Sequence, residues 1–115
     1  MDRETSIEEL KEKVKKFCED RDWNQFHPAK DLAIGIITEA SELLEQFRFK
    51  SEKEIEEMFK HPEKKQKITE EIADVLFFLL RLSQRYDIDL SKELDTKMVK
   101  NEKKYPIEKA RGSNK

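Results

Sequence analysis

Two pairs of acidic residues stand in otherwise apolar segments of the chain. Glu39 and Glu42 form one pair, and Glu71 and Asp74 form the other. Residues at positions i and i+3 of a helix project from the same face about one turn apart, so the two carboxylates of each pair would act together. Apolar residues one turn away place both pairs beside a hydrophobic stripe rather than on a water-facing side. The pattern predicts that four carboxylates converge between two adjacent helices.

Four converging carboxylates repel one another, and burying their charge without compensation is costly. A divalent cation would remove that cost. Oxygen ligands without imidazole or thiolate favour hard ions, so we expect Mg²⁺ first, with Mn²⁺ or Ca²⁺ after it. A di-iron bundle would need Glu-x-x-His pairs, and neither His27 nor His61 stands in such a position. A solvated acidic surface is the alternative, because the chain has 26 acidic residues.

A second chemical signal lies near the C-terminus. Lys97, Asn101 and Lys104 follow one another at i, i+4 and i+7, which places them on one face of a helix. Cationic and amide donors on one ridge would suit a polyphosphate that faces a metal ion. The alternative is a solvated basic helix end that the helix dipole favours.

Aromatic residues supply a third signal. Trp23 and Phe26 fall in a segment without helical periodicity, next to His27. Such residues either stack on a nucleobase or cover an edge of the core. The same two interpretations apply to Phe49 and Phe78, for which the core is the default.

The elements that must position these residues are all helices. With 2 glycines and 3 prolines in 115 residues, the chain lacks the turns that a β-sandwich or barrel requires. Ser6 and Glu9, and again Ser51 and Glu54, have the spacing of capping boxes that begin helices. Apolar periodicity predicts helices from Ile7 to about Arg21, over 29–48, from 52 to about His61, over 63–86, and a last one capped by Asp89.

These helices predict an all-α fold, a four-helix bundle with a short extra helix. The long helix is expected to bury Ile72, Leu76 and Leu79 along with its other apolar residues. We expect one domain over residues 1–110 and a mobile tail over 111–115. Because 43% of the residues are charged, the core is thin for a monomer, which favours self-association.

Composition also excludes several classes of protein. The 24 basic and 26 acidic residues argue against a partner that is a nucleic acid polymer. No apolar run approaches the roughly 18 residues of a membrane span, and the first residues do not form a secretory signal. Cys18 is alone, so no internal disulfide is possible. A cytoplasmic protein without membrane contact is expected.

Taken together, the motifs resemble those of the MazG-like all-α nucleotide pyrophosphohydrolases, and most closely the small dCTP pyrophosphatase branch. The resemblance runs from Phe17 to Arg111. It rests on four phrases in the expected order, which are the segment 21–27, the acidic pairs 39–42 and 70–76, and the segment 97–106 that ends in Tyr105 and Pro106.

The resemblance implies Mg²⁺-dependent hydrolysis of a nucleoside or deoxynucleoside triphosphate, dCTP-like substrates preferred, to the monophosphate and pyrophosphate. It also implies a homodimer or homotetramer, with sites near the subunit interface, that clears unwanted dNTPs. By resemblance the metal ligands would be Glu39, Glu42, Glu71 and Asp74. Proton transfer from the attacking water needs a carboxylate nearby, which predicts Glu42 or the neighbouring Glu45 as general base. Substrate would be held by Trp23, Asn24, Gln25, Phe26, His27, Phe49, Phe78, Lys97, Asn101, Lys104 and Tyr105.

Three departures from the dCTP pyrophosphatase pattern affect base selectivity. This chain has Phe49 in place of Trp, Phe78 in place of Tyr, and Val14 in place of His. The preferred base and sugar, the number of metal ions and the choice between dimer and tetramer therefore stay open. Two alternatives remain, namely a pyrophosphohydrolase for another nucleotide such as dUTP or dATP, and a non-catalytic helical interaction module.

Overall fold

The computed structural model describes residues 1–113, and within them every regular element is a helix. The all-α class predicted from the sequence is confirmed. The elements are α1 (Ile7–Asp20), the 3-10 turn η1 (Asn24–Phe26), α2 (Ala29–Glu45), α3 (Glu52–Lys60), α4 (Pro62–Arg85), α5 (Leu90–Lys104) and α6 (Ile107–Ala110). None of the described helices is both long enough and apolar enough to cross a membrane.

Side-chain caps define where three of these helices begin. The hydroxyl of Ser6 accepts a hydrogen bond from the backbone N–H of Glu9, and the carboxylate of Glu9 accepts one from the N–H of Ser6. The same reciprocal pair forms between Ser51 and Glu54. Asp89 caps α5 through the N–H of Lys92. Both predicted capping boxes are therefore confirmed.

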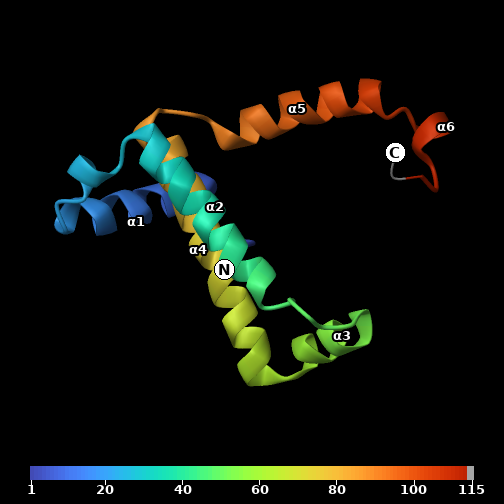
Figure 1. Ribbon diagram of the computed structural model, residues 1–115. Coiled ribbons are helices and arrows are strands. Elements are labelled where there is room, and N and C mark those ends of the chain that lie inside the picture. The colour runs from blue at the N-terminus through green and yellow to red at the C-terminus, as the bar shows by residue number, and fades with distance from the viewer. Residues whose placement is uncertain (114–115) are drawn as a thin grey trace.

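Helices α2 and α4 form the central pair, and they run antiparallel along most of their length (Figure 1). Helix α1 packs across the C-terminal half of α4, and α3 packs against its N-terminal end (Figure 1). Helix α5 leaves the end of α4 and extends away from the pair (Figure 1). The radius of gyration is 17.3 Å, against about 13 Å for a compact domain of similar length. A single chain is therefore open on the side of α5.

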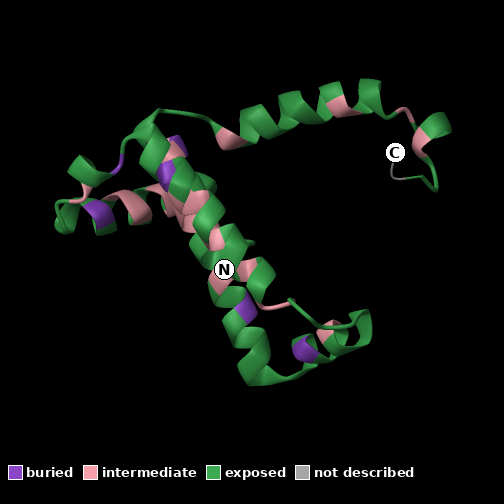
Figure 2. Cartoon of the chain, viewed as in Figure 1, coloured by how far each residue is buried: buried purple, intermediate pink, exposed green. Residues whose placement is uncertain are grey.

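The buried core is small and lies along the α2–α4 pair and its contact with α1 (Figure 2). Its fully buried side chains are Cys18, Leu32, Ile68 and Arg81. The expected burial of Ile72, Leu76 and Leu79 is wrong for this chain, because they are 48%, 44% and 41% exposed. These residues lie on a part of α4 that no other helix of the same chain covers.

The helices differ from the sequence prediction in two places. Helix α2 ends at Glu45 rather than near Arg48, and the chain then turns through Phe49, whose φ is +63°. That left-handed conformation is unfavourable for a bulky residue and cannot continue a helix. A short helix, α6, occupies residues expected to lack periodic structure. Of the tail predicted at 111–115, residues 114–115 lie outside the described part of the chain, and the domain boundary stays a prediction.

Candidate active site

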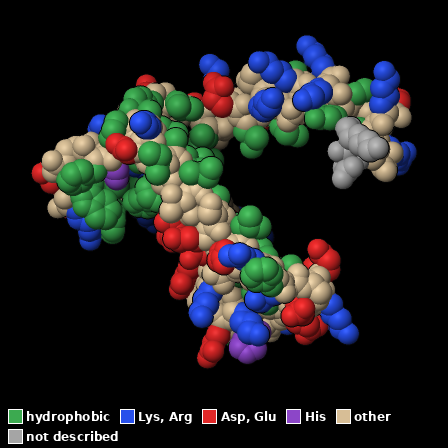
Figure 3. All heavy atoms as spheres, in the orientation of Figure 1, with side chains coloured by type: hydrophobic (Ala, Val, Ile, Leu, Met, Phe, Trp, Pro, Cys, Tyr) green, Lys and Arg blue, Asp and Glu red, His purple; other side chains and the backbone are tan. Residues whose placement is uncertain are grey.

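Three of the acidic side chains singled out in the sequence meet where α2 and α4 lie side by side. One carboxylate oxygen from each of Glu39, Glu42 and Glu71 lies within 4.8 Å of the other two. The two glutamates of α2 are one turn apart on the same face, and Glu71 reaches them from the antiparallel helix. Figure 3 shows acidic side chains gathered over the middle of the α2–α4 pair. The structure thus brings together three of the four carboxylates that the sequence predicts to converge, and Asp74 is not among them.

Two of these carboxylates each have an oxygen in an unfavourable environment. Oε2 of Glu39 and Oε2 of Glu71 are buried and have no hydrogen-bond partner among the described residues. Burial, together with the neighbouring carboxylates, raises the pKa of Glu39 to about 7. Burial and the proximity of Glu42 raise the pKa of Glu71 as well. A buried acceptor without a donor destabilises the fold, so both oxygens favour a cation or a proton.

A hard divalent cation fits this arrangement. Ligand atoms on opposite sides of an octahedral Mg²⁺ lie about 4.2 Å apart, and those around Ca²⁺ about 0.5–1 Å further. Because the three oxygens lie within 4.8 Å of one another, they could bind either ion with little movement of the side chains. Three protein oxygens would leave coordination positions for water and phosphate. The residues present thus suit a divalent metal, and the donor set alone does not distinguish Mg²⁺ from Mn²⁺ or Ca²⁺.

The other two acidic residues singled out in the sequence lie at the margin of this cluster. Asp74 is exposed on α4, where its charge contributes to the raised pKa of Glu39. Its carboxylate is not among the three oxygens that lie within 4.8 Å of one another. Glu45 lies at the end of α2, and its carboxylate forms an exposed ion pair with Arg48 at 3.3 Å. Glu42, which is exposed and has no basic partner among the described residues, is better placed to accept a proton.

Phe78 lies one turn beyond Asp74 on α4, and its ring rests directly on the backbone of α2 at Gly35. A Cβ built at Gly35 would lie 2.5 Å from Cε1 of Phe78, closer than any real contact. Glycine inside a helix costs about 1 kcal/mol relative to alanine, and here it allows the aromatic ring to approach. Gly35 therefore determines how deeply the ring of Phe78 lies between the two helices.

Phe49 is arranged quite differently from Phe78. Its side chain is 89% exposed, and the guanidinium of Arg48 lies 4.5 Å from the centre of its ring. The loop between α2 and α3 thus presents an aromatic ring to solvent beyond the acidic cluster.

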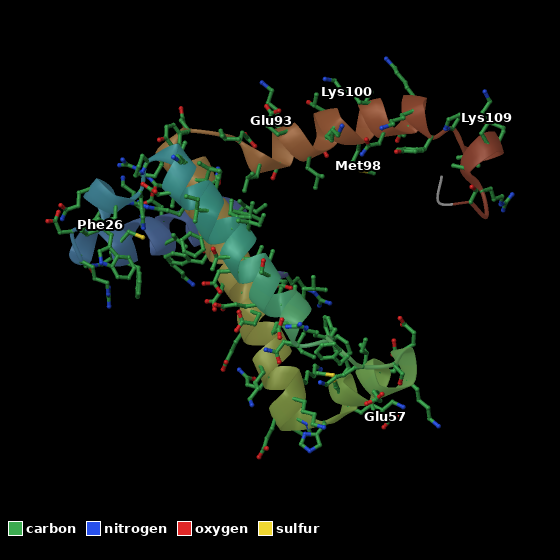
Figure 4. The ribbon with its side chains drawn as sticks, viewed as in Figure 1. Phe26, Glu57, Glu93, Met98, Lys100 and Lys109 are labelled. Carbon is green, nitrogen blue, oxygen red and sulfur yellow. The ribbon has the colours of Figure 1, made fainter. Side chains whose placement is uncertain are left out.

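The segment from Trp23 to His27 includes the η1 turn between α1 and α2. Phe26 is exposed and points away from the helices (Figure 4), and Gln25 bonds the carboxylate of Asp22 within the same loop. Trp23 is half-buried, with its ring edge-on to Phe17. His27, by contrast, is only 8% exposed and turns inward, where Nδ1 accepts a hydrogen bond.

The donor to His27 is Arg81, a residue that the sequence analysis did not single out. Arg81 is fully buried on α4, and its Nε donates to Nδ1 of His27 at 2.9 Å. Its Nη2 donates to Oδ1 of Asn24, and its Nη1 donates to Oε1 of Gln84 at 2.7 Å. Arg81 stands seven residues after Asp74 and three after Phe78, on the same face of α4. That spacing was the sequence signal that could have identified it.

The basic ridge of α5 does not lie beside the acidic cluster of its own chain. Figure 3 shows Lys and Arg side chains along the outer side of α5, the helix that carries Lys97, Asn101 and Lys104 and is followed by Tyr105. Figure 1 shows that this helix extends away from the α2–α4 pair. The predicted phosphate-binding residues and the predicted metal ligands are therefore separate within one chain.

Residues 34–115, which carry both acidic pairs, match the MazG-like family. The chain belongs to this family. Among curated MazG-like relatives, dCTP pyrophosphatase 1 of Rattus norvegicus is 34% identical over 110 residues, which cover 96% of this chain and 65% of the relative. The Homo sapiens protein of the same name is 32% identical over 111 residues, with the same two coverages. This chain thus spans about two thirds of the length of these relatives.

The match to a solved structure covers more of that protein's length. The crystal structure of a pyrophosphatase from Archaeoglobus fulgidus superimposes with a TM-score of 0.80 at 40% sequence identity. The match covers 87% of this chain and 92% of that one. The helical arrangement is therefore that of a known pyrophosphatase structure, and the family match confirms the predicted resemblance.

Proposed function

We propose that the protein hydrolyses nucleoside triphosphates, with dCTP-like deoxynucleotides preferred, to the monophosphate and pyrophosphate with Mg²⁺ as cofactor. One structural observation carries this proposal. Two helices each bring a buried carboxylate oxygen without a hydrogen-bond partner to the same place, and a third carboxylate oxygen lies within 4.8 Å. The names of the dCTP pyrophosphatases and of the archaeal pyrophosphatase support the same reaction class.

In this reaction a water molecule attacks the α-phosphorus, the bond from that phosphorus to the bridging oxygen breaks, and pyrophosphate leaves. Glu42 takes the proton from the attacking water, because its carboxylate is exposed at the edge of the cluster. A divalent cation held by Glu39, Glu42 and Glu71, with Asp74 close by, would neutralise phosphate charge and lower the pKa of a bound water. Glu45 is the second candidate base and would first have to leave Arg48.

The base and sugar are proposed to lie between the acidic cluster and the end of the α2–α4 pair that is next to the Trp23–His27 segment. On α4, Glu71, Asp74 and Phe78 share one face. A nucleotide with its phosphates at the acidic cluster would extend along this face toward Phe78 and the Trp23–His27 segment. Phe49, exposed at the opposite end of α2, would close over the phosphate and sugar side. The phenyl rings at 49 and 78 offer stacking surfaces without hydrogen-bonding groups, so we expect weaker base selectivity than a Trp or Tyr would give.

We further propose that a second copy of the chain completes the site with its own α5. Helices α2 and α5 leave large apolar side chains uncovered, among them Ile37 (66% exposed), Leu44 (70%) and Leu94 (62%). Met98 points from α5 toward the side of the rest of the chain, while Glu93 and Lys100 point away (Figure 4). A partner packed on this apolar side would cover it and bring Lys97, Asn101 and Lys104 toward an acidic cluster.

Product analysis tests the reaction. The purified protein is incubated with each canonical dNTP, with Mg²⁺ or with EDTA, and the products are separated by ion exchange. We expect monophosphate and pyrophosphate in equal amounts, only with Mg²⁺, and fastest with dCTP. The Glu42→Gln protein should fold normally and release neither product. If the folded wild-type protein forms no product from any dNTP, the proposal is rejected in favour of a non-catalytic interaction module.

Light scattering coupled to size-exclusion chromatography tests the assembly. The wild-type protein should elute as a dimer or tetramer, and the Leu94→Lys protein should shift toward the 13.8 kDa monomer. Met98→Lys changes a second exposed residue on the same face of α5, four residues after Leu94, and should have the same effect. A wild-type monomer at all concentrations would contradict a shared site.

A further inference from the structure

Arg81 carries a buried positive charge that no carboxylate among the described residues contacts directly, and the charge of Glu19 acts on it only from beyond salt-bridge distance. Its side chain is fully buried, and among the described residues no Asp or Glu forms a salt bridge with it. All three of its hydrogen-bond acceptors are neutral groups, on His27, Asn24 and Gln84. A buried guanidinium without an anionic partner loses solvation that these bonds only partly replace. Arg81 is therefore a poor choice for stability alone.

The acceptors show what the guanidinium does instead. Two of them belong to the segment between α1 and α2, and the third, Gln84, comes from the next turn of α4 itself. The rigid fork of the guanidinium thus ties both ends of the η1 turn to one point on α4. Trp23 lies between these tied positions and the end of α1, with its ring edge-on to Phe17 and 6.0 Å from the ring of His27.

The same contacts determine which hydrogen-bonding groups of the segment remain available. Since Nδ1 of His27 accepts from Arg81, the ring is neutral and its proton is on Nε2. Oδ1 of Asn24 accepts from Arg81, and the amide NH₂ of Asn24 has no acceptor among the described residues, so it is available to donate. Asn24 itself is exposed. The segment therefore presents fixed donors on its open side.

The face of α4 connects this anchor to the acidic cluster. Glu71, Phe78 and Arg81 lie on one face, and Glu71 is ten residues from Arg81, which is about 15 Å along a helix. An anchor at this position sets the location of Trp23 and Asn24 relative to Phe78.

From these observations, and resting on the proposed function, we infer that Arg81 is the positioning residue for the base end of the nucleotide site. It does not touch the substrate. It acts by holding Asn24 and His27, and through them Trp23, in the arrangement that receives the nucleobase.

Arg81→Met keeps the aliphatic stem and removes the donors, and Arg81→Lys keeps the charge without the fork. Arg85→Met is the matched control, because Arg85 is an exposed arginine one turn further along α4. Gln84→Ala removes one of the three acceptors of the guanidinium and leaves Arg81 in place. It serves as the test variant if the Arg81→Met protein does not fold.

Two measurements do not depend on turnover. Trp23 is the one tryptophan in the chain, so acrylamide quenching of its fluorescence reports the segment directly. Calorimetric titration with dCMP measures binding of base and sugar without hydrolysis. We expect quenching to rise about twofold and the Kd for dCMP to rise about tenfold in Arg81→Met. Arg81→Lys should behave similarly, Gln84→Ala should show a smaller change of the same kind, and Arg85→Met should match the wild type.

Steady-state kinetics then separate positioning from general stability. In Arg81→Met, KM for dCTP should rise about tenfold while kcat changes less than about threefold. Unchanged quenching and unchanged Kd in Arg81→Met would overturn the inference, whatever happens to Tm, and so would a wild-type protein that does not bind dCMP. If the wild type binds dCMP with these mutational effects but hydrolyses no dNTP, the proposed function fails and the role of Arg81 in base binding stands.

Discussion

Glu39 and Glu71 face each other from antiparallel helices, and each holds one buried carboxylate oxygen that receives no hydrogen bond from the described part of the chain. An ionised carboxylate in that position is unstable without a cation, and a protonated one is acceptable. The pair therefore links three quantities, namely the protonation of the site, its metal affinity and the stability of the α2–α4 contact. The first two predictions follow from that link.

The metal-free protein should become less stable as pH rises, because the carboxyl of Glu39 loses its proton. The pKa of Glu39 in the folded state is about 7, above its usual 4.5, so folding takes up a proton between these values. The stabilisation is complete below pH 4.5 and is lost as pH rises through about 7. In EDTA, Glu39→Gln should therefore become increasingly more stable than the wild type across this range.

Thermal melts of both proteins over that pH range measure the difference. His27 acts in the opposite direction, because burial and Arg81 lower its pKa and its contribution to stability falls as pH drops below 6.5. That contribution is present in both proteins and cancels in the comparison. A difference in Tm that does not vary with pH would show that the carboxyl of Glu39 titrates normally.

Mg²⁺ should stabilise the folded protein, and more so at higher pH. A ligand that binds only the folded state at a hundred times its Kd contributes about 2.7 kcal/mol. Protons compete with the metal at Glu39 until pH exceeds about 7. We expect the Tm increase with Mg²⁺ to disappear in Glu71→Gln and to persist in Glu70→Gln, the exposed neighbour on α4. Equal shifts in these two variants would place the ion elsewhere.

Gly35→Ala should cost stability despite the better helix propensity of alanine. The substitution gains about 1 kcal/mol in propensity, but the new Cβ would lie 2.5 Å from the ring of Phe78. Forcing an aromatic ring out of a packed position costs about 1–3 kcal/mol. The net change should be a loss of up to about 2 kcal/mol, with a raised KM for dCTP.

A double-mutant cycle identifies the cause. In a Phe78→Leu background the obstructing ring is absent, so Gly35→Ala should stabilise the protein by about 1 kcal/mol. Urea unfolding of the four proteins gives the coupling free energy. Additive effects would mean that the ring of Phe78 moves aside freely.

Ser51→Ala should destabilise the start of α3 by about 1 kcal/mol, because it removes the hydroxyl that accepts from the N–H of Glu54. The capping box holds the chain two residues after Phe49, so KM should rise along with the loss of stability. Ser91→Ala, in the exposed first turn of α5, is the matched control. An unchanged KM in Ser51→Ala would show that Phe49 does not depend on the cap.

Local signals in the sequence were sufficient to predict the starts of the helices. The capping residues Ser6, Ser51 and Asp89 act through side-chain contacts three residues away, which the sequence shows directly. The convergence of Glu39, Glu42 and Glu71 was also predictable, since helical spacing and an antiparallel return determine it.

Three features depended on contacts or loop geometry that periodicity does not reveal. Ile72 and Leu79 were expected to be buried because they are apolar, but burial requires a covering surface, and one chain does not provide it. Arg81 was overlooked because a charged residue in a helix usually lies on a solvated face. Here the side chain is fully buried, and three acceptors satisfy its donors. The end of α2 was missed because the left-handed turn at Phe49 is set by the loop and not by residue type.

The separation of α5 from the acidic cluster of its own chain also bears on how the protein responds to its own abundance. If each site takes its basic ridge from a neighbour, the rate per molecule of protein falls on dilution, and the order of the reaction in protein exceeds one near the dissociation constant of the assembly. Chains lacking Glu42 and chains lacking Lys97, each inactive alone, would restore part of the turnover when mixed. The cell would then adjust the clearance of nucleotides more steeply than it adjusts the amount of the protein.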